Sequence, residues 1–153
     1  MASLIGYYSL FFGLLCSLVI ISISVINLRD TYKFSIKIIS FTFLQFFLVV
    51  VSFLGLILSF INSDFSNETV FNHSHTTKPL FYKISGTWGN HEGSLLLWLL
   101  VLSIFLIIFT ITSKNLSNKY RILTLFFQEI IILGFLLFIL FTSNPFMSLF
   151  PIP

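Results

Sequence analysis

The sequence has few charged residues and almost none of the residues that build covalent frameworks. Asp, Glu, Lys and Arg together make up only 8% of the 153 residues, whereas soluble domains carry about 25%. This shortage excludes a water-soluble fold. The single cysteine, Cys16, lies within an apolar run, so the chain alone cannot form a disulfide, a CxxC redox pair or a cysteine-based metal site.

What the sequence has in abundance is apolar residues, which reach 57% of the chain with a mean hydropathy of +1.04. They form four long runs at residues 10–26, 38–61, 94–111 and 122–141. A helix needs about 20 apolar residues to cross a bilayer. We therefore predict an all-α integral membrane protein, with residues 1–153 forming a single transmembrane domain of four helices. The few polar side chains within the runs are expected to bond to helix backbone or to neighbouring helices.

The basic residues indicate how the chain is oriented in the membrane. Three Lys or Arg residues lie between the first two runs and three between the last two, against two in the longer polar loop at residues 62–90. The positive-inside rule then places both short connections on the cytoplasmic or matrix side. Both termini and the loop would lie on the opposite side. The loop is too short to bury a core of its own, and it shows no periodicity that predicts secondary structure.

The most unusual stretch of the chain leads from this loop into the third apolar run. Three of the seven glycines, Gly86, Gly89 and Gly93, fall within eight residues there, together with Trp, His and Glu. Such dense glycine indicates a sharp bend or a close approach of the backbone to another surface. Asn90 is a candidate N-cap, and Glu92 would complement the dipole of the helix that follows. We call residues 86–98 the polar shelf, because their composition predicts a polar segment at a membrane boundary that leads into a helix.

The side chains of the polar shelf allow more than one interpretation. Trp88 fits an interfacial aromatic anchor, while Trp98, one turn inside the helix, fits a helix contact or a flat apolar ligand equally well. His91 and Glu92 fit either a solvated helix start or a polar contact to a partner or to a cofactor. His91 alone lacks the companions that a metal site needs, so we expect no metal ligand in this chain.

Glu129 is the one ionisable residue well inside a predicted span. A carboxylate within a membrane is costly unless it is paired, so such a residue is a site candidate by default. Either protonation or a pairing with Lys119 or Arg121, about two turns away, would remove the isolated charge.

Two longer motifs resemble a known family. Residues 87–98, TWGNHEGSLLLW, resemble the TWG-x-HEGSLLLW signature of the CcmF family, the haem-lyase membrane subunits of cytochrome c maturation. Residues 134–146, GFLLFILFTSNPF, are similar to the FLLF-x-x-FTSNPF segment of that family, and residues 63–83 are similar to the segment that precedes the first motif. The order and spacing of these motifs agree over nearly the whole chain.

The resemblance implies a subunit of a complex that attaches haem covalently to apocytochrome c. Family members continue beyond the NPF segment into a His-Pro-Pro element, a tryptophan-rich WWD motif and haem-ligating intramembrane histidines, none of which this sequence contains. We therefore expect the N-terminal portion of CcmF, made as a separate polypeptide of a split CcmF or as a truncated gene product, with no catalytic residue and no haem ligand of its own. The implied partners are CcmF fragments carrying the WWD motif, apocytochrome c, haem-delivery proteins and membrane lipid, but not nucleic acid.

On this resemblance the polar shelf becomes a candidate contact surface for haem or apocytochrome c, formed by Trp88, His91, Glu92, Gly93, Ser94 and Trp98. Split genes of this family and a residue usage typical of AT-rich codons favour the mitochondrial inner membrane, with the termini facing the intermembrane space, over a bacterial plasma membrane. The alternative is a non-catalytic structural membrane subunit of a respiratory-chain assembly.

Overall fold

Four long helices form the body of the protein. The computed structural model describes residues 1–30 and 35–150, and these contain six α-helices, one short 3₁₀ helix and no strand. The long helices are α1 (Ala2–Asp30), α2 (Ile36–Ile61), α5 (His91–Thr112) and α6 (Asn118–Phe141). Each is long and apolar enough to cross a membrane. The predicted all-α membrane fold with four transmembrane helices is therefore confirmed.

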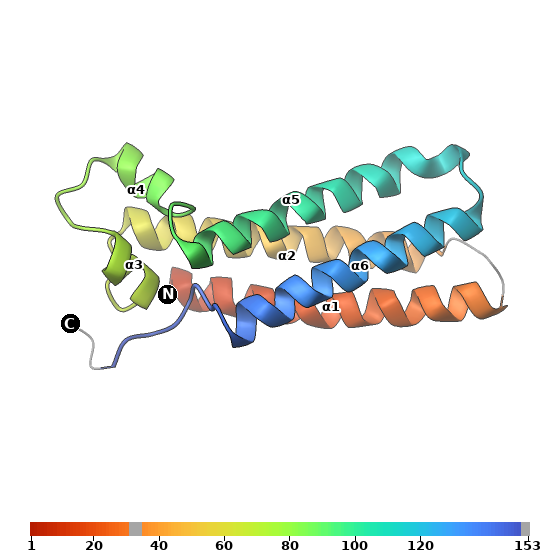
Figure 1. The fold of residues 1–153 in the computed structure, drawn as a ribbon, viewed down its shortest axis with the longest axis horizontal. Coiled ribbons are helices and arrows are strands. Elements are labelled where there is room, and N and C mark those ends of the chain that lie inside the picture. Colours follow the sequence, from red (N-terminus) through yellow and green to blue (C-terminus); the bar gives the residue numbers. More distant parts are fainter. Residues whose placement is uncertain (31–34, 151–153) are drawn as a thin grey trace.

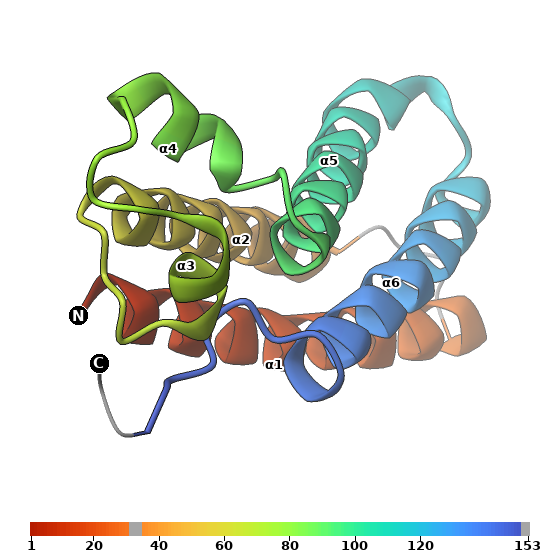
Figure 2. The ribbon, with the colours of Figure 1, turned by 60° about the vertical axis from the view of Figure 1, so that its left-hand side comes forward.

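The long helices run alternately up and down and pack as a four-helix bundle. Helix α1 contacts α2 and α6, and α5 completes the ring by contacting α2 and α6. Figure 1 shows the four helices lying lengthwise beside one another, and Figure 2 shows the same bundle turned towards one end. A short connection, such as the one between α5 and α6, favours an antiparallel arrangement of the two helices that it joins.

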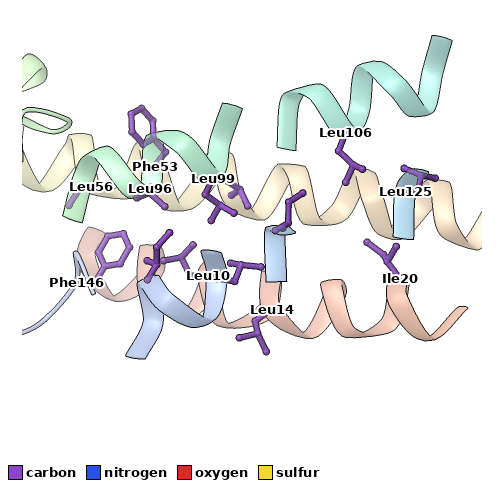
Figure 3. Packing of buried hydrophobic residues seen from close by; sticks show 14 of the residues in the cluster. Leu10, Leu14, Ile20, Phe53, Leu56, Leu96, Leu99, Leu106, Leu125 and Phe146 are labelled. Carbon is purple, nitrogen blue, oxygen red and sulfur yellow. The ribbon is translucent and has the colours of Figure 1, made fainter. Parts of the chain in front are cut away.

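Apolar side chains fill the interior of the bundle and also cover its outside. Figure 3 shows Leu10, Leu56, Leu99 and Leu125, from four different helices, in one buried cluster. The outer faces carry many exposed large apolar side chains, among them Phe105. Soluble monomers rarely expose so much contiguous apolar surface. This surface fits a bilayer, and the chain is a multi-pass membrane protein.

The helices extend beyond the predicted spans, and the difference is largest at the N-terminus. Helix α1 begins at Ala2 instead of residue 10, because no Gly-Pro pair or other strong breaker interrupts the first turns. Small residues at the contact allow the start of α1 to pack closely on α2. A Cβ at Gly55 would lie 3.0 Å from the carbonyl oxygen of Ala2.

Residues 62–90 contain two short helices that the sequence analysis did not predict, α3 (Glu68–His73) and α4 (Leu80–Gly86). The Asn67 side chain caps α3 by accepting a hydrogen bond from the backbone N–H of Val70 at 3.2 Å. Pro79 precedes α4, at a helix start where a missing N–H costs nothing. Figure 1 shows both helices at the end of the bundle where α1 begins and α6 ends. This end, with α3, α4 and residues 142–150, is called the polar end below.

Candidate functional site

The polar shelf is a tight turn between α4 and α5, and Asn90 holds it together. The Asn90 Oδ1 atom accepts a hydrogen bond of 2.7 Å from the backbone N–H of Gly93, which is the predicted N-cap interaction. Its Nδ2 atom donates to the carbonyl oxygens of Gly86 at 2.9 Å and Thr87 at 3.2 Å. One side chain therefore joins the end of α4 to the start of α5, and both of its polar atoms are engaged in these hydrogen bonds.

Gly93 lies where the first turn of α5 presses against the backbone of the turn. A Cβ added to Gly93 would lie 1.6 Å from the carbonyl oxygen of Thr87 and 2.8 Å from its carbonyl carbon. No side chain fits at that distance, so the close approach expected from the glycines is present here. Gly86 and Gly89 are less restricted, since their nearest neighbours would be 3.4 Å from an added Cβ.

The six candidate residues separate into two groups in the structure. Gly93 is buried, and the Ser94 hydroxyl donates to the carbonyl oxygen of His91 at 2.9 Å within the same helix turn. These two residues build the turn. The others are available for contacts: Trp88 is 40% exposed and Trp98 60% exposed, while His91 is exposed and Glu92 partly exposed.

Two of the available side chains share one face of α5. His91 and Trp98 are seven residues apart, which is about two helical turns and returns to nearly the same direction. Phe105, a further seven residues along, is 60% exposed. The outward face of α5 therefore carries His91 in its first turn and the aromatic side chains of Trp98 and Phe105 further along the helix.

Residues 142–150 return from α6 and run beside α3. The Asn67 Nδ2 atom donates to the Pro145 carbonyl oxygen at 2.9 Å and to the Ser3 hydroxyl at 3.0 Å. The backbone N–H of Glu68 donates to the carbonyl oxygen of Met147, and that of Leu149 to the carbonyl oxygen of Ser66, both at 2.9 Å. Asn67 is only 1% exposed, so one buried amide ties together the N-terminus, α3 and the segment that follows α6.

This arrangement brings the two family-like motifs into one polar pocket. The pocket has a volume of about 100 Å³ and is lined by Glu68, Thr69, Asn72, His73, Glu92, Thr142, Ser143, Asn144 and Met147. Glu92 comes from the first motif, and the three residues from 142 to 144 come from the second. The carboxyl groups of Glu68 and Glu92 can accept hydrogen bonds from a cationic or amide side chain.

The pocket is too small and too polar for a porphyrin. Pockets that hold cofactors measure about 300–1,000 Å³ and are mostly apolar, whereas this one measures about 100 Å³. Haem does not fit here. In the described part of the chain, no group of three or more His, Cys, Asp or Glu residues could hold a metal ion.

Sequence analysis missed the residues that α3 and the NPF segment contribute to this pocket. Glu68, Ser143 and Asn144 carried no separate signal beyond the similarity of their segments to the family. Their meeting depends on tertiary contacts: the buried Asn67 amide, in a loop without periodicity, and the backbone hydrogen bonds beside it. Nothing in the linear sequence separates it from the other polar residues of that loop.

Glu129 does not belong to the polar end. It lies fully buried in the middle of α6, where it accepts hydrogen bonds from Ser17 of α1 and Gln45 of α2. Arg121, one of the predicted partners, donates instead to the Ser113 hydroxyl at 3.1 Å and towards the Thr110 carbonyl oxygen at 3.4 Å. Glu129 is thus part of a second polar cluster, remote from the shelf.

Comparison with known proteins identifies the relatives of this chain. It is 40% identical over 146 residues to the cytochrome c-type biogenesis protein CycK of Bradyrhizobium diazoefficiens, an alignment that covers 94% of this chain and 22% of CycK. It is 46% identical to ccl1 of Rhodobacter capsulatus over 69% of this chain and 16% of that protein. It is 40% identical to CcmF of Escherichia coli over 72% of this chain and 17% of that protein. No protein-family model matches the chain.

The fold is also known. A solved structure of the cytochrome c haem lyase CcmF superposes with a TM-score of 0.88 at 22% sequence identity, covering 97% of this chain and 25% of that chain. The sequence relatives and this structure are all much longer than the chain, which spans 16% to 22% of the length of the three curated relatives named above. Over the part that it spans, the chain belongs to the CcmF family of cytochrome c-type biogenesis proteins.

Proposed function

We propose that this chain is a subunit of a cytochrome c haem lyase complex, and that its polar end forms part of the wall at which apocytochrome c is received. The relatives are cytochrome c-type biogenesis proteins, and the similar solved structure is a haem lyase. The WWD motif and the haem ligands come from other chains of the complex. The haem substrate contacts this chain at most through the exposed aromatic side chains of the polar shelf.

One observation carries this proposal: the two family-like motifs, about 50 residues apart in the sequence, meet in a single polar pocket beside the shelf. A packing role alone would not require Glu92, His91 and Trp88 to remain accessible. Gly93, Ser94 and Asn90 hold the turn so that these side chains face outward. The pocket accepts a polar side chain, which fits a protein partner such as apocytochrome c.

The proposed location is the mitochondrial inner membrane, with the polar end facing the intermembrane space. The bundle supports the orientation, because the start of α1, α3, α4 and residues 142–150 lie at one end and the connection between α5 and α6 at the other (Figure 1). Six of the eight Lys and Arg residues belong to the two short connections or the helix ends beside them. The relatives named above are bacterial, and the equivalent bacterial site is the plasma membrane with the polar end outside.

The double variant His91→Ala, Glu92→Gln tests the proposed function. We expect it to abolish holocytochrome c formation while leaving the abundance of the subunit and its association with other chains unchanged. The apolar run from Leu95 onward directs insertion without these two side chains. Covalent haem in cytochrome c is measured beside blotted levels of the subunit.

His75→Ala is the matched control, since His75 is an exposed histidine of the same polar end that does not line the pocket. It should retain normal haem attachment. Normal haem attachment in the double variant would contradict the proposal and favour the alternative, a structural subunit of a respiratory-chain assembly.

Cysteine labelling tests the orientation. In a Cys16→Ser background, a cysteine at Thr77 in the α3–α4 connection should label from one side of intact membrane vesicles and a cysteine at Ser117 from the other. Both positions are exposed in the structure. Labelling of both from the same side would contradict the four-span topology.

A further inference from the structure

The centre of the bundle contains a polar cluster that the proposed function does not use. Ser17 of α1, Gln45 of α2 and Glu129 of α6 are all fully buried. Glu129 lies 11 residues after the first residue of α6 and 12 before the last, which places it about 17 Å from either end of the helix. Because the hydrocarbon core is about 30 Å thick, this carboxyl group lies near the middle of the membrane.

Both hydrogen bonds to the carboxyl group of Glu129 reach the same oxygen atom. The Ser17 hydroxyl donates to Oε2 at 2.8 Å, and the Gln45 Nε2 atom donates to Oε2 at 3.2 Å. The other carboxyl oxygen, Oε1, is buried and has no hydrogen-bond partner among the described residues. The amide oxygen of Gln45, Oε1, is buried and without a partner in the same way. The cluster therefore holds two orphaned acceptors on the two groups that already share a hydrogen bond.

The cluster is short of one donor. In the middle turns of α1, α2, α5 and α6, the titratable side chains are Glu129 and Cys16, which precedes Ser17 on α1. The basic side chains of these helices, and of the 3₁₀ helix that follows α5, lie near the end of the bundle away from the polar end: Arg29, Lys37, Lys114, Lys119 and Arg121. Arg121, the closest of them along α6, is eight residues or about 12 Å away and directs its guanidinium towards α5.

We propose that Glu129 is a proton-binding site, carried as the neutral acid, and that its Oε1–H donates to Oε1 of Gln45. A carboxylic acid and a primary amide then form a ring of two hydrogen bonds, N–H to Oε2 and O–H to Oε1. One proton satisfies both orphaned acceptors and leaves no charge at the membrane centre, where a charge is costly. If the Gln45 amide were rotated by half a turn, its Oε1 atom would face Oε2 of Glu129 instead. Two acceptors would again face each other, and the carboxyl group would again need one proton.

The site would join α1, α2 and α6 without a salt bridge. Ser17 and Gln45 lie on helices that are antiparallel neighbours. Glu129 lies on α6, which follows α3, α4 and α5 in the sequence and packs back against α1. A buried network that is fully satisfied specifies one packing of its helices, because any slip leaves its groups unpaired. The bound proton completes this network.

Infrared spectroscopy of the purified full-length chain in lipid nanodiscs tests the proposal. At neutral pH we expect the carbonyl band of a protonated carboxylic acid, which shifts in D₂O and is lost in Glu129→Gln. Glu92→Gln removes a carboxyl group of the polar end and is the matched control, since it should leave the band unchanged. The absence of this band in the wild-type chain would mean an ionised Glu129 and would overturn the proposal.

An exchange of the two side chains supplies a second measurement. Glu129→Gln forms an amide–amide ring with Gln45 and should keep the thermal stability of the wild type. The double variant Gln45→Glu, Glu129→Gln restores an acid–amide pair, now with the acid on α2, and should recover both the infrared band and the stability. Glu129→Ala removes the ring and should unfold at lower temperature. Loss of folding in Glu129→Gln would contradict the proposal, because this variant is the neutral mimic of the protonated side chain.

Discussion

The polar shelf and the Glu129 cluster both place polar groups among apolar helices, but they are stabilised over different distances in the sequence. At the shelf, each hydrogen bond of the Asn90 side chain joins residues three or four positions apart. In the cluster, the hydrogen bonds of Glu129 join residues 84 and 112 positions apart. The shelf is therefore encoded locally, whereas the cluster exists only after three helices have packed.

The same contrast separates the shelf from the pocket beside it. The turn that presents His91 and Glu92 depends on its own residues. The pocket that Glu92 lines depends on Asn67, which joins segments 64 and 78 residues away. Variants at these positions can therefore change one region and leave the other intact.

The largest effect is expected from Gly93→Ala at the shelf. The added methyl group would meet the Thr87 carbonyl at 1.6 Å, and overpacking of this kind costs about 1–3 kcal/mol or more. Thermal unfolding in detergent should show a clear loss of stability together with loss of haem attachment. Gly134→Ala is the control, since nothing lies within 4 Å of a Cβ there. Equal stability of Gly93→Ala and Gly134→Ala would contradict the close approach of Gly93 to the Thr87 carbonyl.

Asn67→Ala should have the next largest effect, on the pocket. It removes the cap of α3 and leaves the buried Pro145 carbonyl without its donor, a loss of about 1–3 kcal/mol. Protease sensitivity of residues 142–150 should increase while the shelf stays intact. Asn72→Ala, on an exposed position of the same short helix, should not increase it. Unchanged protease sensitivity in Asn67→Ala would show that the segment is held by other contacts.

Asn90→Ala should be milder, with a loss of about 1 kcal/mol that is typical for an N-cap. The matched control is Ser117→Ala at the N-cap of α6, where the side chain makes no capping hydrogen bond. Unfolding temperatures of the two variants are compared in the same detergent. A loss in Ser117→Ala as large as that in Asn90→Ala would mean that the cap is not the cause.

Trp98→Leu should change stability least, by less than about 0.5 kcal/mol, because the side chain is exposed and supports no buried group. Its effect should appear in haem attachment to apocytochrome c if Trp98 contacts the substrate. Haem attachment at the wild-type level with unchanged stability would assign Trp98 to lipid contact and restrict the contact surface to Trp88, His91 and Glu92.

Much of the fold was predictable from the sequence. Four apolar runs of 17 to 24 residues predict four spanning helices, since backbone groups in lipid must be satisfied within each segment. The Asn90 cap and the close approach at Gly93 were also predictable, because both arise between neighbouring residues. Helices α3 and α4 were not, because six or seven residues do not form a stable helix without tertiary contacts.

The candidate site was only partly predictable for the same reason. The sequence alone pointed to Trp88, His91, Glu92 and Trp98, and the structure keeps them accessible. It could not distinguish them from Gly93 and Ser94, whose atoms are engaged within the turn.

The sequence by itself determined that the chain lies in a membrane, where its spans are and where the polar shelf turns into α5, because apolar length and local caps act over a few residues. Only the tertiary structure decided that residues 142–144 meet Glu92 at one pocket and that Glu129 meets Ser17 and Gln45 at the centre. Those contacts depend on which faces of the helices pack together. Since apolar side chains cover all sides of these helices in lipid, hydrophobic periodicity does not reveal the packed face, and a few buried polar groups specify it instead.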